Sequence, residues 1–337
     1  MTRADGSGDA RSPQIIQGAC LDVMRTLETC RFDAAVTDPP YGLGFKRQQW
    51  DYELPTLPEL REVFRVVKPG AYLIAFSGSR TYHRLASRIE DAGFTIHPLL
   101  AWIFGTGFPK ARKLEIEGLE EWRYGLQALK PALEPIVMAQ KPASESSMRS
   151  NVLRWGAGAL NIGQARVPVQ GDSDDEDAKD GAQLGRWPSN VIHDGGQQVL
   201  DAFPDAPGAS SDTKASHQTT QTGGRVFNGV RKPMDLQARG DVGSAARFFY
   251  CAKPTAQERN ADGPNLHPTV KPLALMRWLC SLVTPPGGEV LDPWCGSGTT
   301  GKAAVELGFG FVGIDQDSEA VETARRRVAG AQPGLPL

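Results

Sequence analysis

Cysteine and histidine are scarce in this 337-residue sequence, which has five of each. No two cysteines have the Cys-x-x-Cys spacing and the histidines are scattered, so the ligand pattern of a zinc site is absent. The odd number of cysteines argues against a disulfide-stapled fold and favours a reducing compartment. We therefore expect a metal-free, cytoplasmic protein.

Long hydrophobic runs are also missing. The longest apolar stretches, such as Ala71 to Phe76, are far shorter than the roughly 20 residues of a membrane-spanning helix. The N-terminus, with Arg3, Asp5, Asp9 and Arg11, has no apolar segment of the kind found in secretion signals. Apolar residues make up 40% of the chain and charged residues 23%, which excludes a fully disordered chain or a coiled coil.

A large net charge is lacking too, because 37 Lys and Arg nearly balance 39 Asp and Glu. The net charge of −2 gives no overall sign of a nucleic-acid partner. Locally the balance differs: residues 172–180 hold six acids and one lysine, whereas residues 211–260 hold eight basic and four acidic side chains. The second stretch also contains Phe227 and the aromatic run 248–250. It suits either a nucleic-acid strand or a polar loop that leads into a core strand.

Short apolar runs alternate with helical periods at both ends of the sequence. Strands are expected at 32–37, 71–76, 94–104, 288–291 and 310–314. Helices are expected at 57–68, where Pro69-Gly70 ends the pattern, and at 80–92, 273–283, 299–307 and 317–328. This alternation predicts an α/β fold with a mainly parallel sheet covered on both faces. The middle, from about 141 to 250, is rich in Gly, Ser, Asp and Gln and has no lasting helical stripe.

A glycine-rich turn follows the expected strand at 288–291. Its sequence is Asp292-Pro-Trp-Cys-Gly-Ser-Gly-Thr-Thr300, and Gly296, Gly298 and Gly301 satisfy G-x-G-x-x-G. Asp315 ends the next strand, where it would hold a ribose, so a nicotinamide dinucleotide is one candidate ligand. However, Asp292 would repel a pyrophosphate and suits a ligand with an ammonium group, such as S-adenosylmethionine. A tight turn without a ligand is the third interpretation.

A second motif, Asp38-Pro-Pro-Tyr41, ends the apolar strand at 32–37. The two prolines fix the backbone and hold a carboxylate, outward carbonyls and an aromatic ring in one place. Asp38 and the Pro39 carbonyl could accept the N–H bonds of an exocyclic base amine and orient its lone pair. Tyr41 could stack on a base taken out of the helix. The alternative is a simple Pro-Pro turn with a surface tyrosine.

Together the two motifs resemble those of the β-class DNA amino-methyltransferases, in which the catalytic motif precedes the cofactor motif and a target-recognition region lies between them. Further matches are Gly42-Leu-Gly-Phe45 with Trp50-Asp51, WIFGTGFPK at 102–110, LKPALEPIVMAQKP at 129–142 and His267-Pro-Thr-Val-Lys-Pro272. The resemblance implies a seven-stranded, Rossmann-like S-adenosylmethionine methyltransferase sheet in circularly permuted order. It divides the chain into a catalytic half (1–143), a target-recognition region with the acidic loop 172–180 (144–250) and a cofactor-binding half (251–330).

The resemblance also implies roles for individual residues. The base-amine site would consist of Asp38, Pro39, Pro40 and Tyr41. The cofactor site would consist of Asp292, Trp294, Gly296, Ser297 and Gly298, with Asp315 on the ribose and Thr269 and Lys271 near the cofactor carboxylate. The family often has Gly-Asp near the N-terminus, where this chain has Gly18-Ala19-Cys20. Cys20 or a main-chain group would then replace that acid beside the cofactor adenine.

By resemblance, the substrate is double-stranded DNA and the product N6-methyladenine, because cytosine-N4 relatives more often begin the tetrapeptide with Ser. Cytosine N4 remains the alternative, and a nicotinamide oxidoreductase and a catalytically silent DNA-binding relative are two further ones. A homodimer is possible by analogy with related enzymes. Candidate DNA contacts in the middle region are Arg149, Arg154, Arg166, Arg225, Arg231, Lys232 and Arg247.

Overall fold

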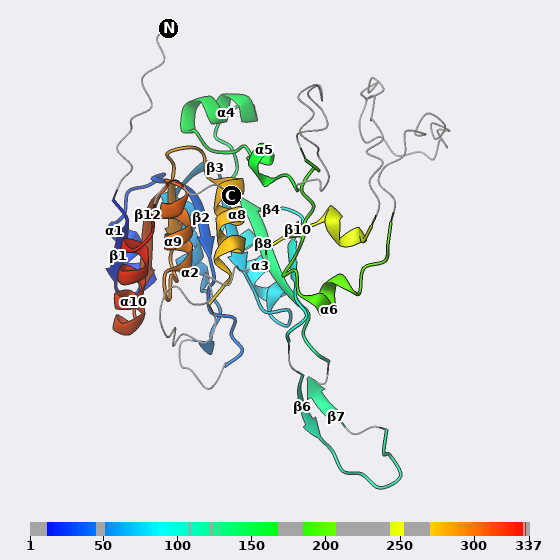
Figure 1. Cartoon of the computed structure of the whole chain (residues 1–337). Coiled ribbons are helices and arrows are strands. Elements are labelled where there is room, and N and C mark those ends of the chain that lie inside the picture. The colour runs from blue at the N-terminus through cyan, green and yellow to red at the C-terminus, as the bar shows by residue number, and fades with distance from the viewer. Residues whose placement is uncertain are drawn as a thin grey trace, which may run out of the picture.

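The computed structural model shows a ten-stranded mixed sheet with helices on both faces (Figure 1). It describes residues 12–44, 51–107, 109–121, 124–127, 129–167, 185–206, 243–252, 270–332 and 334. The acidic loop 172–180, Thr269, Arg225, Arg231 and Lys232 lie outside the described residues. No helix in the described ranges is long and apolar enough to cross a membrane.

The sheet brings strands from both ends of the chain together. Its order is β1 (Gln14–Gln17), β12 (Gly310–Asp315), β11 (Glu289–Asp292), β2 (Phe32–Thr37), β3 (Val67–Phe76), β8 (Leu133–Gln140), β5 (Leu100–Ile103), β9 (Val191–His193) and β10 (Tyr250–Cys251), with the short β4 (Thr95–Ile96) also on β8. Strand β8 is antiparallel to its neighbours, and the other pairs in this sheet are parallel. The expectation of a mainly parallel α/β sheet is confirmed.

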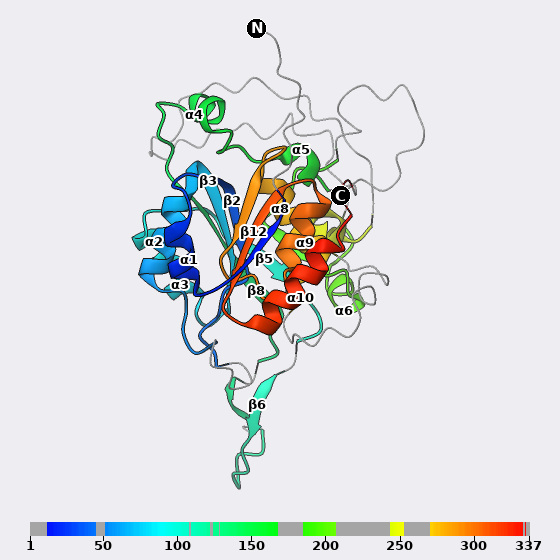
Figure 2. The ribbon, with the colours of Figure 1, turned by 90° about the vertical axis from the view of Figure 1, so that its left-hand side faces the viewer.

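Two apolar layers cover the sheet. Helices α1 (Cys20–Thr26), α2 (Leu57–Val66) and α3 (Tyr82–Asp91) pack on one face, and α8 (Leu273–Val283), α9 (Thr299–Glu306) and α10 (Ser318–Ala329) on the other (Figure 2). All six residues of β2 are buried, as expected for a central strand covered on both sides. The described residues also form α4 (Met148–Trp155), α5 (Ile162–Ala165), α6 (Gln197–Leu200) and the 3-10 helix η4 (Ala245–Phe248).

The expected helix at 57–68 is two residues too long. Helix α2 ends at Val66, and β3 already begins at Val67 and runs through Pro69-Gly70. The Lys141 ammonium accounts for this boundary, because it donates to the carbonyls of Phe64 and Val67, at 2.7 and 2.8 Å, where the helix ends. Pro69 lacks only an N–H donor. Gly70 extends the pairing of β3 past the end of β8 by donating its N–H to the Lys141 carbonyl at 3.0 Å.

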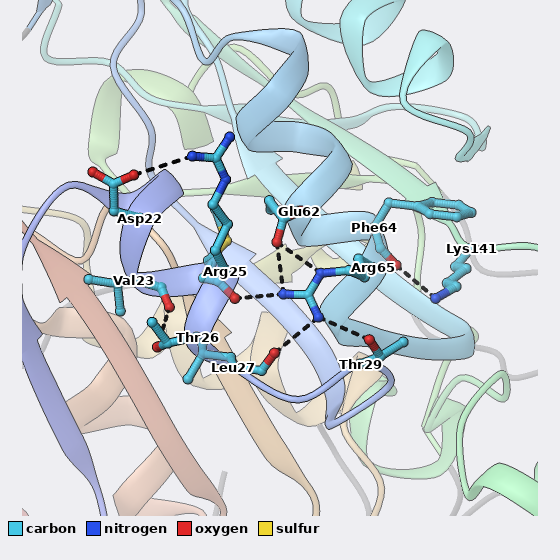
Figure 3. Close-up of polar contacts among 11 residues, drawn as sticks. Asp22, Val23, Arg25, Thr26, Leu27, Thr29, Glu62, Phe64, Arg65 and Lys141 are labelled. Atoms are coloured by element: carbon cyan, nitrogen blue, oxygen red, sulfur yellow. Dashed lines mark hydrogen bonds and ion pairs between the residues drawn. The ribbon is translucent and has the colours of Figure 1, made fainter.

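Arg65 ties the end of α2 to the end of α1 (Figure 3). Its guanidinium donates to the carbonyls of Met24 and Leu27 at 2.7 and 3.0 Å and to the Thr29 hydroxyl at 2.9 Å. The Leu27 N–H also donates to the Met24 carbonyl, at 3.0 Å, and Arg65 adds charged donors to both carbonyls at a helix end that has few partners of its own. The contacts fix α1 beside α2 and thereby place the segment at Gly18–Cys20.

The expected number of seven strands is wrong for this sheet. Strands β9 and β10, from the polar middle of the sequence, continue the sheet beyond β5, and β4 adds a tenth strand. Strand β9 pairs in parallel with β5 and so covers N–H and C=O groups that an edge strand would expose. Three- and two-residue strands are too short to show a hydrophobic period, which is why the sequence pattern missed them.

The two motif-bearing strands lie side by side. Val290 and Leu291 of β11 pair with Ala34 and Ala35 of β2, in parallel. The carboxyl ends of both strands therefore open at the same edge of the sheet, where Asp38 and the 292–298 turn follow them. A separate hairpin of β6 (Lys110–Lys113) and β7 (Tyr124–Gln127) projects from the molecule (Figure 1).

Candidate active site

Asp38 stands at the end of β2 with a donor on each carboxylate oxygen. The Tyr41 hydroxyl donates to Oδ1 at 2.7 Å, and the Lys271 ammonium donates to Oδ2 at 2.8 Å. The turn between Asp38 and Tyr41 is held by Asp51, which is buried and whose Oδ1 accepts from the Tyr41 and Gly42 N–H groups at 2.6 and 3.2 Å. The tetrapeptide therefore forms a closed, preorganised unit.

Glu134 joins this unit and was not singled out from the sequence. Its Oε2 lies 3.3 Å from the Lys271 ammonium and accepts from the Tyr41 hydroxyl at 3.4 Å. Glu134 is near the start of β8, ahead of the apolar run Ile136–Ala139. The available signal was its place in the 129–142 segment that resembles the family, but a lone acid at the head of a buried strand is usually a surface residue.

Burial shapes the proton affinities of these groups. Lys271 is 8% exposed, and burial alone lowers its pKa, but the charges of Asp38 and Glu134 outweigh this and raise it above the ordinary value. Burial raises the pKa of Glu134, although Lys271 opposes the shift. Burial, followed by the charge of Asp38, raises the pKa of the Tyr41 phenol well above its ordinary value. Lys271 and Tyr41 therefore keep their protons at neutral pH.

Asp292, which begins the glycine-rich turn, is 1% exposed and accepts hydrogen bonds on both carboxylate oxygens. Its Oδ1 accepts from the Thr37 hydroxyl and its Oδ2 from the Thr300 hydroxyl, both at 2.6 Å. The Trp294 N–H, at 3.2 Å, is a third donor to Oδ1. Burial raises the pKa of Asp292 to about 7, even though these three donors lower it. Because Thr37 immediately precedes Asp38, this carboxylate connects the two motifs directly.

The glycines of the turn allow close approach of backbone to backbone. Gly298 has φ +78°, and a Cβ there would lie 2.8 Å from the Cβ of Ala324 on α10. Gly296 donates its N–H to Asp315 Oδ2 at 2.9 Å. Ser297 accepts from the buried Arg327 through its carbonyl and its hydroxyl, both at 2.8 Å. Arg327 and Ala324 of α10 and the Asp315 carboxylate therefore hold the turn in place.

Asp315 and the N-terminal segment meet beside this turn. The Gly18 N–H donates to the Asp315 carbonyl at 2.9 Å, and Asp315 Oδ1 accepts from the Asp317 N–H at 2.9 Å. The Cys20 thiol donates instead to Glu59 on α2 at 3.1 Å, and burial raises its pKa. At this edge the structure thus brings together Asp315, the main chain of Gly18 and the half-buried Trp294.

These residues fit S-adenosylmethionine by their chemistry. Carboxylates at Asp292 and Asp315 suit a cationic ligand with ribose hydroxyls better than a pyrophosphate. The glycine turn before α9 lets a ligand approach the backbone closely. Among the described residues no group of three or more His, Cys, Asp and Glu is arranged to hold a metal ion.

Comparison with known proteins agrees with this geometry. The family model described as DNA methylase, of the N6 and N4 amino-methyltransferases, matches residues 32–326. The chain belongs to this family. S-adenosylmethionine is the family's methyl donor, and membership removes the nicotinamide oxidoreductase as an alternative.

Individual relatives are distant. The type II methyltransferase M.HindIII of Haemophilus influenzae is 23% identical over 79% of this chain and 66% of its own length. The type II methyltransferase M2.DpnII of Streptococcus pneumoniae is 45% identical over 18% of this chain and 23% of its own length. The match therefore covers less than two thirds of either relative.

One solved structure shows the same fold. The cytosine-N4-specific PvuII DNA methyltransferase has a TM-score of 0.51 at 14% identity, covering 94% of this chain and 86% of that one. The M1.HpyAVI–SAM complex has a TM-score of 0.46 at 18% identity, covering 94% and 100%. The expected methyltransferase fold is confirmed by the first of these.

The described candidates for DNA contact differ in how they are held. Arg247 donates to the carbonyls of Ser244 and Ala206, and Arg166 to that of Gly185. Arg154 pairs with Glu145 at 2.7 Å. Arg149 is exposed on α4. DNA contact by any of them stays a prediction.

Proposed function

We propose that this chain is a site-specific DNA methyltransferase that transfers the methyl group of S-adenosylmethionine to N6 of an adenine flipped out of double-stranded DNA. The observation that carries the proposal is the Thr37–Asp292 hydrogen bond, because it sets Asp38 beside the cofactor turn. An Asp at the first position of the Asp38–Tyr41 tetrapeptide favours adenine over cytosine.

The residues around Asp38 suit an amine substrate. A carboxylate and the neighbouring Pro39 carbonyl are acceptors only, so they orient an amino group through its two N–H bonds and leave its lone pair free. Pro39 and Pro40 hold these acceptors in place, and Tyr41 supplies an aromatic face for the base. The chain therefore accelerates the reaction by alignment and by removing water from the amine.

The cofactor, when bound, supplies an electrophilic methyl group on a positively charged sulfur. The turn Asp292–Gly298, with Trp294, Gly296 and Ser297, would hold its methionine part, and Asp315 its ribose. The main chain at Gly18 is better placed beside Asp315 than the Cys20 thiol, which faces α2. Thr269 and Lys271 remain assigned to the cofactor carboxylate, although the structure also pairs Lys271 with Asp38.

Cytosine N4 is the second candidate target, because its exocyclic amine makes the same hydrogen bonds. We assign catalysis to residues 1–143, target selection to residues 144–250 and cofactor binding to residues 251–330. A homodimer and a cytoplasmic location stay predictions.

The test is transfer of labelled methyl from S-adenosylmethionine to DNA of mixed sequence, followed by nucleoside mass spectrometry and base-resolved mapping. We expect N6-methyladenine at one short sequence. N4-methylcytosine would establish the alternative target. Absence of labelled DNA, with cofactor binding intact, would identify a silent relative.

A further inference from the structure

Lys271 lies within contact distance of two carboxylates, those of Asp38 and Glu134. Its ammonium is 2.8 Å from Asp38 Oδ2 and 3.3 Å from Glu134 Oε2. The ammonium also lies over two rings, 5.3 Å from the centroid of Tyr41 and 4.9 Å from that of Phe76. These three groups have two negative charges and one positive charge, so their formal sum is −1.

Glu134 comes from a different element than either of its partners. Asp38 follows β2 and Lys271 lies two residues before α8, whereas Glu134 lies on β8, opposite Trp102 of β5. The groups that face the Glu134 carboxylate in the described residues are Lys271, Asp38 and the neutral Tyr41 hydroxyl. Without Glu134, Asp38 and Lys271 would form a neutral pair.

The net charge of Asp38, Glu134 and Lys271 affects the methylation of an amine, because this reaction moves positive charge onto the target nitrogen. The amino nitrogen forms the N–C bond with its lone pair while the carbon–sulfur bond breaks, so positive charge leaves sulfur and appears on nitrogen. The nitrogen then releases one proton, which Asp38 accepts and passes to water. An ammonium 2.8 Å from Asp38 opposes charge on that nitrogen, and in a partly buried site this repulsion is weakly screened.

We propose that Glu134 is a positioning residue that neutralises Lys271, so that Asp38 keeps its full negative charge for the nitrogen that becomes positive. This inference rests on the proposed function. Besides its assigned contact with the cofactor carboxylate, Lys271 then orients Asp38 and links the segment before α8 to β8. Glu134 removes the electrostatic cost of placing the ammonium there.

The experiment compares Glu134→Gln, which keeps the shape and removes the charge, with Glu134→Asp and with the double variant Glu134→Gln/Lys271→Met, which restores a sum of −1. The matched control is Glu117→Gln, an exposed acid on the β6–β7 hairpin. Single-turnover methylation is measured at saturating DNA and S-adenosylmethionine, and the dissociation constants of both are measured separately.

We expect Glu134→Gln to slow methyl transfer at least about tenfold with unchanged dissociation constants. Glu134→Asp should retain more activity than Glu134→Gln. At saturating S-adenosylmethionine, which offsets the loss of Lys271 from the cofactor carboxylate, the double variant should react about threefold or more faster than Glu134→Gln, since it removes the unbalanced ammonium. Wild-type rates in Glu134→Gln, or a double variant no faster than Glu134→Gln, would overturn the inference.

A second readout needs neither DNA nor cofactor. The pKa of Lys271 is followed by NMR in the free protein with 13C-labelled lysine, assigned by its loss in Lys271→Met. We expect Glu134→Gln to lower this pKa, because one of two carboxylates that raise it is gone, and Glu117→Gln to leave it unchanged. An unchanged pKa in Glu134→Gln contradicts the inference directly. Wild-type protein that transfers no methyl group, with the pKa shift present, overturns the proposed function instead.

Discussion

The Thr37 hydroxyl donates a 2.6 Å hydrogen bond to Asp292 Oδ1, across 255 positions of sequence. Thr37 ends β2 and Asp292 ends β11, so this bond joins the last residues of two adjacent parallel strands. Asp38 immediately follows Thr37, and the glycine-rich turn begins at Asp292. A single buried contact thus sets the relative position of the two motifs.

Removing this donor should affect both stability and methyl transfer. Thr37→Val leaves a fully buried carboxylate with one donor fewer, and we expect a loss of about 1–3 kcal/mol in the free energy of unfolding. The matched control is Thr26→Val, whose exposed hydroxyl donates to the Val23 carbonyl. Urea unfolding measures both variants. Equal, small effects for the two would show that the Thr37–Asp292 bond is not structural.

Asp292 should impose a pH dependence on stability. Its pKa is raised from 3.8 to about 7 by burial, so between about pH 4 and 7 the folded protein keeps a proton that the unfolded chain releases. The contribution of this group to stability therefore decreases as pH rises through that window and is constant above it.

The comparison with Asp292→Asn isolates this effect. The stability of the variant relative to the wild type should increase by up to about 4 kcal/mol from pH 4 to pH 7, the equivalent of about three pK units. Urea titrations of the cofactor-free protein at several pH values measure it. A stability difference that is independent of pH would show that Asp292 is ionised throughout.

Gly298 offers a test of the turn itself. Gly298→Ala places a Cβ 2.8 Å from Ala324 at a positive φ, and we expect it to lower the free energy of unfolding by about 2 kcal/mol or more. Gly287→Ala is the matched control, because Gly287 has a similar φ of +71° but nothing within 4 Å of an added Cβ. The difference between the variants therefore reports the contact with α10. S-adenosylmethionine binding should weaken only in Gly298→Ala.

Asp38→Ala should abolish methyl transfer and leave cofactor binding nearly intact. The change removes the acceptor for the target amine, whereas the Asp292–Gly298 turn keeps its own contacts. Calorimetric binding of S-adenosylmethionine and transfer of labelled methyl separate the two effects. Methylation at the wild-type rate would remove Asp38 from the proposed site.

Most helices and long strands could be predicted from the sequence, because their periods and boundaries are local. The strand at 32–37 and the helix at 273–283 have the expected bounds. The end of α2 could not be predicted, since the Lys141 ammonium, more than seventy positions away, satisfies its last carbonyls. The short β9 and β10 could not be predicted either, because they are strands only by virtue of the β5 edge.

The sequence by itself determined the two motifs, their order and therefore the family, because each motif is a continuous turn at the end of an apolar strand. Only the tertiary structure decided what surrounds Asp38. Lys271 reaches it from 233 positions away, and Glu134, which shares that ammonium, comes from a third element. The charge balance of the site depends on distances between side chains from separate strands and helices, and packing of the sheet and α8 is what sets those distances.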